Sequence, residues 1–490
     1  MEPRSLAGRA VLAVALMIGF YLLAVAMIGG LLFIPYAEMQ YAHRLHIKLA
    51  IACLAGAGAI AWAILPRGDS FEDPGPQLAA REQPRLFDRL RDVATRTGQA
   101  MPSEVFLVSN MNAWVANRGG VMGFGSRRVM GLGLPLMQVA DLEQFEAILA
   151  HEFGHYHGGD TRLGPWIYKT RTAIGRTLST LGDGGWVQAP FRWYGTLFMR
   201  ITQAISRAQE LSADRLAATV VGARPLIEGL KRVHAEGAAF DAYWRQEAVP
   251  VLQAGFHAPL AEGFTRFLRA PRIRAAVDKN LAAELEHGAS DPFDSHPPLR
   301  ERIAALQALI GESAPATGDG ASAISLLSDV AESERSLLGF LSKSADVASF
   351  RAVAWDETTT AVFVPSWRQQ AQRMAEPLGA STFADLPELI RTRGRDLARL
   401  IAGRDSDVPE ALISQVLAGP LGCCIAIALV DAGWTASAAV GEPVTVRKDD
   451  AVLEPFAIVP TLCADESAKE RWLSTLRVHG TADLRLAGSA

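Results

Sequence analysis

Two histidines and a glutamate lie close together in the middle of the chain, in the pattern His-Glu-Phe-Gly-His at residues 151–155. On a helix, residues four positions apart share one face, so His151 and His155 can bind a single metal ion. Zinc accepts imidazole nitrogens, and catalytic zinc sites combine three protein ligands with a water molecule. Glu152 projects beside the same face, where its carboxylate can take a proton from that water. The pattern therefore indicates activation of water by zinc.

A third protein ligand is available in a later helical segment. Glu210 shares one helix face with Arg207 and Asp214, at spacings of three and four residues. Glu210 can complete the ligand set, and Asp214 can orient one of the histidines through its free ring nitrogen. The alternatives are that both carboxylates are ordinary surface groups and that the histidines are only packed within a helix.

The helix that carries the histidines has a clear predicted start. Asp141 is a good N-cap, and Gln144 three residues later completes a capping-box pattern. The apolar stripe that follows consists of Leu142, Phe145, Leu149 and Phe153. We expect this helix to stop at Gly158-Gly159.

Helices and short strands are predicted around this helix. The amphipathic pattern of residues 83–97 predicts a helix with Leu86, Leu90, Val93 and Ala94 on its apolar side. Strand-like segments divided by Gly and Asn occupy residues 104–109, 112–117 and 127–132.

Helical patterns continue after the histidines. Residues 161–222 are predicted to be helical with a break at Asp183-Gly184-Gly185, and a helix introduced by Pro297-Pro298 covers residues 291–309. Beyond a linker-like segment at residues 311–322, helical patterns are mixed with a hairpin over residues 435–460 and a last helix over residues 464–477.

The N-terminal region is strongly apolar. Residues 10–34 hold no charge over 25 positions, which is long enough to cross a bilayer as a helix. A second apolar run at residues 49–65 is 17 residues long, and a brief polar loop at residues 35–48 separates the two. A cleaved signal peptide is the alternative for the first run, but that run exceeds the ~7–15 apolar residues of a signal core. A transmembrane helical hairpin is the simpler prediction.

Arginines and cysteines both favour a cytoplasmic catalytic domain. Arg4 and Arg9 precede the first span, and the arginines that follow the second are Arg67, Arg81, Arg85, Arg89 and Arg91. The positive-inside rule then places both ends in the cytoplasm. The four cysteines (Cys53, Cys423, Cys424 and Cys463) form no CxxC pair, which fits a reducing compartment. The predicted location is the inner cell membrane, as a multi-pass protein.

Length and composition set the domain organisation. A chain of 490 residues is too long for one core, so we expect a membrane anchor at residues 1–66, a central domain at 77–310 and a C-terminal domain at 323–490. The net charge of −4 and the absence of a basic run give no reason to expect nucleic acid. The glycine-rich residues 119–125 lack the GxGxxG order and a following Lys, so no nucleotide is expected either.

Three motifs in order resemble those of one family. HEFGHYHGGD at residues 151–160, AQELSADRLAA at 208–218 and SHPPLRERI at 295–303 are similar to the signatures of the HtpX-like and CAAX prenyl protease family of membrane zinc metallopeptidases. The resemblance covers about residues 88–309. It implies a gluzincin-type site with His151, His155 and Glu210 as zinc ligands and Glu152 as general base.

The same resemblance implies how a substrate is held. Asn112, Ala113 and Trp114 resemble the edge strand that hydrogen-bonds an extended substrate. His296 and Arg302 resemble a pair near the scissile carbonyl, where they can stabilise the developing oxyanion. From the residues alone, His296 is a loop residue and Arg302 a charge on a helix surface.

Some members of the family have further membrane spans between the HExxH helix and the third ligand. Here that stretch is interrupted by arginines, and its aromatic residues suit helices lying at the membrane interface. The many-span architecture of prenyl-protein processing enzymes is absent, so prenylated proteins are a doubtful substrate class.

The predicted fold class is α+β and mainly helical: a zincin-type metalloprotease domain behind a transmembrane hairpin, with a separate C-terminal α+β region. The predicted function is that of a membrane-anchored zinc metalloendopeptidase with one Zn²⁺ per chain, in contact with a polypeptide substrate and the lipid bilayer, and acting in membrane protein quality control. One alternative is a chaperone-like or adaptor protein that binds peptides in the same groove without cleaving them. Glu152 argues against it, because a binding protein needs no general base. Another alternative is a membrane scaffold whose C-terminal region carries the function.

Overall fold

The chain has two compact units. The computed structural model describes residues 3–65, 71–119, 126–156, 164–182, 185, 187–288, 297–310, 320–342, 349–403, 408–465 and 467–486. Unit 1 consists of Met1–Gly237 and Asp278–Leu341, and unit 2 consists of Ala238–Val277 and Ser342–Ala490. The division differs from the boundary expected near residues 311–322.

Strand pairing and backbone contacts account for this difference. Phe256–His257 (β4) pairs in parallel with Arg351–Ala352 (β5), which joins the segment before residue 277 to the C-terminal unit. Two hydrogen bonds join the end of the linker-like segment at residues 311–322 to unit 1. Ala323 N donates to Ala140 O at 2.9 Å, and Leu142 N donates to Ala321 O at 3.1 Å. Both contacts join residues far apart in the sequence, so composition alone does not reveal them.

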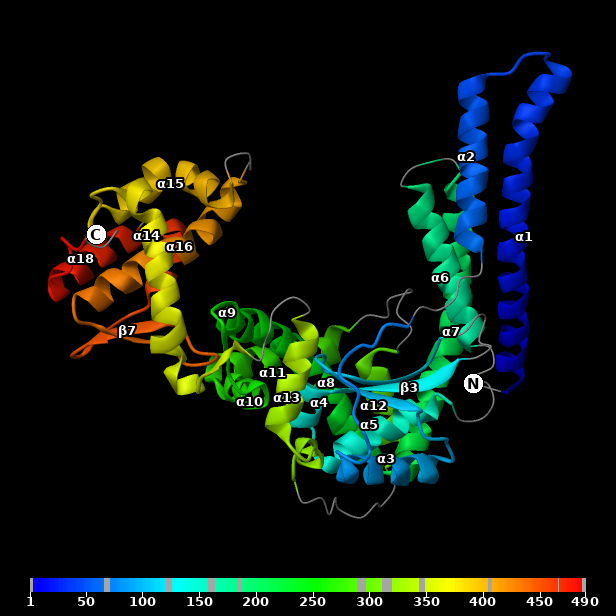
Figure 1. Cartoon of the computed structure of the whole chain (residues 1–490), viewed down its shortest axis with the longest axis horizontal. Coiled ribbons are helices and arrows are strands. Elements are labelled where there is room, and N and C mark those ends of the chain that lie inside the picture. The colour runs from blue at the N-terminus through cyan, green and yellow to red at the C-terminus, as the bar shows by residue number, and fades with distance from the viewer. Residues whose placement is uncertain are drawn as a thin grey trace. The chain divides into compact units, whose positions relative to one another are not determined.

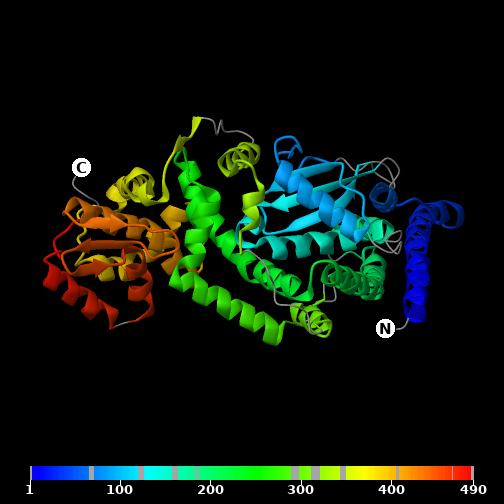
Figure 2. The same cartoon turned by 90° about the horizontal axis from the view of Figure 1, so that it is seen from below.

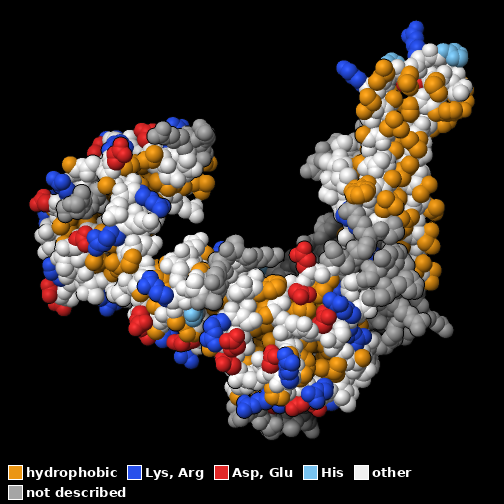
Figure 3. Space-filling view, viewed as in Figure 1, with side chains coloured by type: hydrophobic (Ala, Val, Ile, Leu, Met, Phe, Trp, Pro, Cys, Tyr) orange, Lys and Arg blue, Asp and Glu red, His pale blue; other side chains and the backbone are white. Residues whose placement is uncertain are grey.

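Two long apolar helices begin unit 1. α1 (Pro3–Tyr41) and α2 (Ile47–Ile64) lie side by side as a hairpin (Figure 1). Both are long and apolar enough to cross a membrane, as is α16 (Glu410–Asp431) in unit 2. Apolar side chains cover much of the hairpin surface (Figure 3), as expected of helices that face lipid.

The loop expected over residues 35–48 is shorter than predicted. α1 continues through Pro35 to Tyr41, because apolar helices tolerate an internal proline and the next residues favour helix. The turn that remains is held by Glu38, whose carboxylate accepts a hydrogen bond from His46 N at 3.2 Å and lies 2.8 Å from His46 Nδ1.

Two further helices pack against this hairpin. α6 (Gly164–Leu181) contacts α2, and α7 (Ala189–Val220) contacts α1, around a core that includes Phe20, Ile60, Ile174, Phe191 and Phe198. The hydroxyl of Tyr194 donates to Leu16 O at 2.6 Å. The first half of α7 is therefore fixed to α1, whereas its second half continues to Glu210 and Asp214.

A small sheet lies next to the helix that carries the histidines. It consists of β1 (Glu104–Val108), β2 (Ala113–Arg118) and β3 (Arg127–Gly133) in the order β1-β3-β2. β1 runs parallel to β3 and β2 runs antiparallel to it, so β2 is an edge strand. Gly131 pairs with Trp114, and a Cβ at Gly131 would lie 2.4 Å from the Trp114 ring. Only glycine lets the indole lie across the sheet at this position.

The sheet packs on α5 (Leu142–Gly154), which packs in turn on α3 (Pro84–Thr97) and α7 (Figures 1 and 2). The predicted capping box is confirmed: Gln144 N donates to Asp141 Oδ1 at 2.8 Å, and Asp141 N donates to Gln144 Oε1 at 3.3 Å. The predicted end of the helix at Gly158-Gly159 is wrong, because α5 ends at Gly154. Tyr156 N donates to Phe153 O at 3.0 Å, and this tighter turn closes the helix early.

The remaining elements of unit 1 include the helix that follows the Pro-Pro pair. α12 (Leu299–Gln307) begins after Pro298 and packs on α7; residues 291–296 of the expected helix lie outside the described residues. The other elements are α4 (Leu134–Val139), η3 (Ala323–Leu326) and α13 (Val330–Leu341). α8 (Ala223–Tyr243) and α11 (Pro271–His287) contribute residues to both units.

Unit 2 is built around α16, whose side chains at Leu417, Leu421, Cys424, Ile425 and Leu429 are fully buried. A three-stranded sheet of β6 (Thr435–Ser437), β7 (Thr445–Lys448) and β8 (Ala451–Leu453), followed by the helix α17 (Pro455–Ala464), replaces the single hairpin expected over residues 435–460. The other helices are η2 (Trp244–Ala248), α9 (Val249–Gln253), α10 (Leu260–Arg269), η5 (Trp355–Glu357), η6 (Thr359–Phe363), α14 (Val364–Leu378), α15 (Leu386–Ala402) and α18 (Ala468–His479).

The crossing of α5 and α7 predicts a sharp effect of one methyl group. A Cβ at Gly154 would lie 2.8 Å from Ala213 Cα, so Gly154→Ala must push the two helices apart. We expect a loss of about 1–3 kcal/mol in the stability of unit 1, measured as a lower apparent Tm.

Gly237→Ala is the matched control. Gly237 is also helical, and no atom lies within 4 Å of the added Cβ, so this change should leave the Tm unchanged or raise it. Equal effects of the two substitutions would contradict a close contact between α5 and α7.

Candidate metal centre

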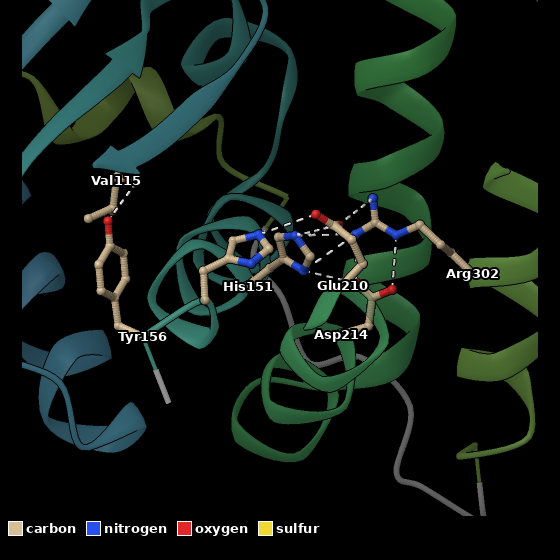
Figure 4. Close-up of polar contacts among 7 residues, drawn as sticks. Val115, His151, Tyr156, Glu210, Asp214 and Arg302 are labelled. Carbon is tan, nitrogen blue, oxygen red and sulfur yellow. Dashed lines mark hydrogen bonds and ion pairs between the residues drawn. The ribbon is translucent and has the colours of Figure 1, made fainter. Parts of the chain in front are cut away.

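Three potential metal ligands converge in unit 1. The ligand atoms of His151, His155 and Glu210 all lie within 4.8 Å of one another. His151 Nε2 is 3.5 Å from Glu210 Oε2, and His155 Nε2 is 3.6 Å from Glu210 Oε1. The two imidazole rings stand nearly perpendicular, at an interplanar angle of 81°. Figure 4 shows His151 and Glu210 pointing toward each other from α5 and α7.

These distances fit a tetrahedral metal ion. Two ligands at about 2.0–2.1 Å from a tetrahedral zinc ion lie about 3.3–3.4 Å apart. The observed separations of 3.5 and 3.6 Å are close to that value. Two imidazoles and one carboxylate are also a donor set that catalytic zinc sites use, so the residues present fit zinc.

The close crossing of α5 and α7 produces this geometry. Gly154 lies against Ala213, so the end of α5 and the C-terminal part of α7 approach each other at their backbones. His155 is the C-cap of α5 with a helical backbone (φ −61°, ψ −13°), so its ring still faces the same side as the ring of His151.

The three potential ligands are buried to different degrees. His151 and Glu210 are each 5% exposed, whereas the His155 side chain retains 27% of its exposure. Glu152 is partly buried on the turn between the two histidines. His155 is thus the most exposed of the three potential ligands.

Asp214 contacts the far nitrogen of His151. Its Oδ1 atom lies 2.9 Å from His151 Nδ1, one turn of α7 beyond Glu210. A proton on Nδ1 shared with Asp214 leaves Nε2, the atom that faces Glu210, available for a metal ion. This is the contact that the predicted orienting role of Asp214 requires.

Arg302 is buried, so the interpretation of this residue as a charge on a helix surface is wrong. It is 4% exposed, and it donates to Asp214 from Nε at 2.9 Å and from Nη2 at 2.6 Å. Its Nη1 lies 3.8 Å from Glu210 Oε2. α12 packs on α7 and brings this guanidinium to the site, where it lies beside His151 (Figure 4).

Burial and mutual hydrogen bonds shift the pKa values of the charged side chains at the site. Burial lowers the pKa of His151, but hydrogen bonds to Asp214 and Glu210 outweigh it and raise this pKa from 6.5 to about 9. Burial raises the pKa of Asp214, but hydrogen bonds from Arg302 and His151 lower it below its ordinary value. Asp214 is therefore ionised at neutral pH, and the histidine holds a proton that a metal ion would displace.

The edge strand β2 lies on the side of His151 that is opposite to Glu210 (Figure 4). Ala113 and Trp114 are its first residues, and Asn112 precedes it. The Trp114 side chain packs with Phe71 and Phe106 on one face of the sheet, and does not extend from the strand edge. The role of these residues in binding substrate stays a prediction, and His296 lies outside the described residues.

Tyr156 is a residue of the site that sequence reasoning missed. Its hydroxyl donates to Val115 O of β2 at 3.0 Å (Figure 4), and burial is the largest of the effects that raise its pKa to about 12. The one signal in the sequence was its place directly after His155.

Known proteins are similar to this part of the chain. Residues 80–310 match Peptidase family M48. A "Protease HtpX homolog" of Chlorobium phaeobacteroides strain BS1 is 26% identical over 298 residues, which cover 54% of this chain and 84% of that protein. A protein of the same name from Pelodictyon phaeoclathratiforme is 26% identical over 253 residues, covering 47% of this chain and 74% of the relative.

One solved structure is also similar. The crystal structure of S. mikatae Ste24p is 16% identical and covers 60% of this chain and 67% of that chain. The TM-score of the two structures is 0.26. The family match and the relatives confirm the resemblance to HtpX-like proteases, and residues 80–310 are the part of the chain that is similar to peptidase family M48.

Proposed function

We propose that this protein is a membrane-anchored zinc metalloendopeptidase that hydrolyses peptide bonds with water. One observation carries the proposal: the ligand atoms of His151, His155 and Glu210 meet within 4.8 Å, at separations that suit a tetrahedral ion. The match of this segment to a peptidase family supports peptide bonds as the target.

Each residue of the site has a distinct task in this mechanism. His151, His155 and Glu210 would hold the metal ion, which when bound would lower the pKa of a water molecule and polarise a carbonyl group. Glu152 takes the proton of the attacking water and delivers it to the leaving amine.

A second layer of residues keeps the ligands in place. Asp214 fixes the tautomer and the orientation of His151 through the 2.9 Å contact. Arg302 keeps Asp214 ionised, because its two hydrogen bonds stabilise the carboxylate in a buried position. We propose this positioning role for Arg302 beside the predicted role of stabilising an oxyanion, to which His296 would also contribute.

The substrate is proposed to be an extended polypeptide that lies along β2, including Asn112, Ala113 and Trp114. The apolar hairpin α1–α2 would hold the site at the inner membrane, with the peptidase domain in the cytoplasm. Damaged or misfolded membrane proteins are then the proposed substrates. The alternative function, peptide binding without cleavage, is tested by the change at Glu152 described below.

The first prediction concerns the metal. The purified protein should contain about one zinc ion per chain, and Glu210→Ala should lose most of it, because two imidazoles leave a catalytic ligand set incomplete. Elemental analysis after dialysis measures this. Glu146→Ala removes another buried carboxylate, on α5 and paired with Arg89, and should retain the zinc. Unchanged zinc in Glu210→Ala would exclude Glu210 as a ligand.

The second prediction concerns the general base. Glu152→Gln should keep both its zinc and its fold while cleavage of an unfolded protein falls about 10²–10⁴-fold, because general-base catalysis contributes about this much. The rate is measured under saturating substrate, with zinc content and Tm determined on the same samples. Wild-type turnover in this variant would exclude the proposed mechanism, and absence of cleavage in both proteins would favour the peptide-binding alternative.

The third prediction concerns pH. Zinc binds neutral imidazole, and the pKa of His151 in the metal-free protein is about 9. The apparent zinc affinity should therefore rise up to about tenfold per pH unit below pH 9 and then level off. In Asp214→Asn the hydrogen bond that raises this pKa is weakened, so the plateau should begin at lower pH, with affinity about 10–100-fold weaker. Competition with a chromophoric chelator measures the zinc affinity of the wild type and of Asp214→Asn as a function of pH. Parallel affinity curves for the two proteins would contradict this role of Asp214.

A further inference from the structure

The two histidines of the site are held unequally. His151 lies within the hydrogen-bonded part of α5, and its Nδ1 atom is 2.9 Å from Asp214 Oδ1. His155 is the C-cap of α5 and follows its last helical residue, Gly154. Helix ends fray, because their last carbonyl groups have no partner within the helix. The His155 side chain is also 27% exposed, against 6% for His151. The backbone at His155 therefore needs a restraint from outside the helix.

Tyr156 supplies such a restraint. Its backbone N–H donates to Phe153 O at 3.0 Å, which closes the last turn of α5. Its hydroxyl donates to Val115 O of β2 at 3.0 Å and also makes a hydrogen bond with the backbone of Asn117. The residue directly after His155 is thus joined to the helix through its backbone and to the sheet through its side chain.

The ring of Tyr156 is also held from a second strand. The guanidinium of Arg128 on β3 lies over this ring, with its Cζ atom 4.1 Å from the ring centroid. Arg128 Nη1 donates in turn to Ala100 O at 3.1 Å, in the loop between α3 and β1. Because β2 and β3 are paired, the phenol contacts one sheet at two points. A side chain that is already fixed in this way can hold its neighbour in one geometry.

The restraints on the two histidines come from opposite directions. Figure 4 shows Tyr156 reaching toward β2 on the side of His151 that is opposite to Glu210. Asp214 on α7 orients His151 from the side of Glu210. His155 is restrained through the residue that follows it, by β2 and β3.

We propose that Tyr156 is a positioning residue for His155, and that its contacts with β2 and β3 fix the turn from which His155 enters the metal site. The proposal rests on the proposed function, since it assumes that His155 is a zinc ligand. In this role Tyr156 contacts neither the metal ion nor the substrate, and it acts through the backbone that it shares with His155.

Zinc affinity of the full-length protein, measured by competition with chromophoric chelators, tests this role. Tyr156→Phe keeps the ring beside Arg128 and removes only the hydroxyl, so it should bind zinc about twofold to tenfold more weakly than the wild type. Tyr194→Phe is the matched control, because that hydroxyl also donates to a backbone carbonyl, Leu16 O, in the part of α7 that packs on α1. It should leave the zinc affinity unchanged.

Double-mutant cycles separate the positioning of His155 from a general loss of structure. In protein that carries His155→Ala, Tyr156→Phe should not weaken the remaining zinc binding further, because the residue that it positions is absent. Chelators of lower affinity extend the measurement to this weaker binding. In protein that carries Asp214→Asn, Tyr156→Phe should keep its full effect, since Asp214 acts on His151.

The proposal is overturned if Tyr156→Phe binds zinc as tightly as the wild type, or if its effect persists in His155→Ala, as a purely structural role predicts. Failure of the proposed function gives a different result. Wild-type protein that binds no zinc would contradict both. If the zinc affinities follow the expected pattern and the wild type does not cleave an unfolded protein, only the proposed function fails.

Discussion

The close crossing of α5 and α7 is the constraint on which the site depends. Gly154 has no side chain, so Ala213 can lie against the backbone at the end of α5. This contact sets the separation between the histidines of one helix and the carboxylates of the other. Because α7 also packs on α1, the same helix connects the apolar hairpin to the site. A shift of about 1 Å at such a contact is large compared with the tolerance of a catalytic arrangement.

The site places several charged side chains in a buried position, and the free-energy cost of removing them from water must be offset. Burying an isolated carboxylate costs several kcal/mol, and a buried pair is stabilising only when its geometry is good. Asp214 meets this condition through two hydrogen bonds from Arg302 and its contact with His151. Glu210 has Arg302 Nη1 at 3.8 Å and the two imidazoles at 3.5 and 3.6 Å. In the proposed function, the zinc ion supplies the remaining positive charge.

Local patterns in the sequence predicted what is local in the structure. The capping box of α5, the apolar face of α3 and the positions of β1, β2 and β3 follow from spacing and turn residues. The predictions failed where distant segments decide. Arg302 and Asp214 are 88 residues apart, so no spacing rule shows that the arginine is buried. The β4–β5 pairing moved the boundary of unit 2. Tyr156 was missed because its partner, Val115, lies 41 residues earlier.

The central claim is that His151, His155 and Glu210 hold one zinc ion in a catalytic geometry. X-ray absorption at the zinc K edge of the purified full-length protein tests it most directly. The account predicts four nitrogen or oxygen neighbours at about 2.0–2.1 Å, with the outer-shell scattering of two imidazole rings. In Glu210→Ala, this spectrum should be lost or reduced. A shell of oxygen atoms alone, a sulfur neighbour, or a spectrum with no imidazole scattering would contradict the account.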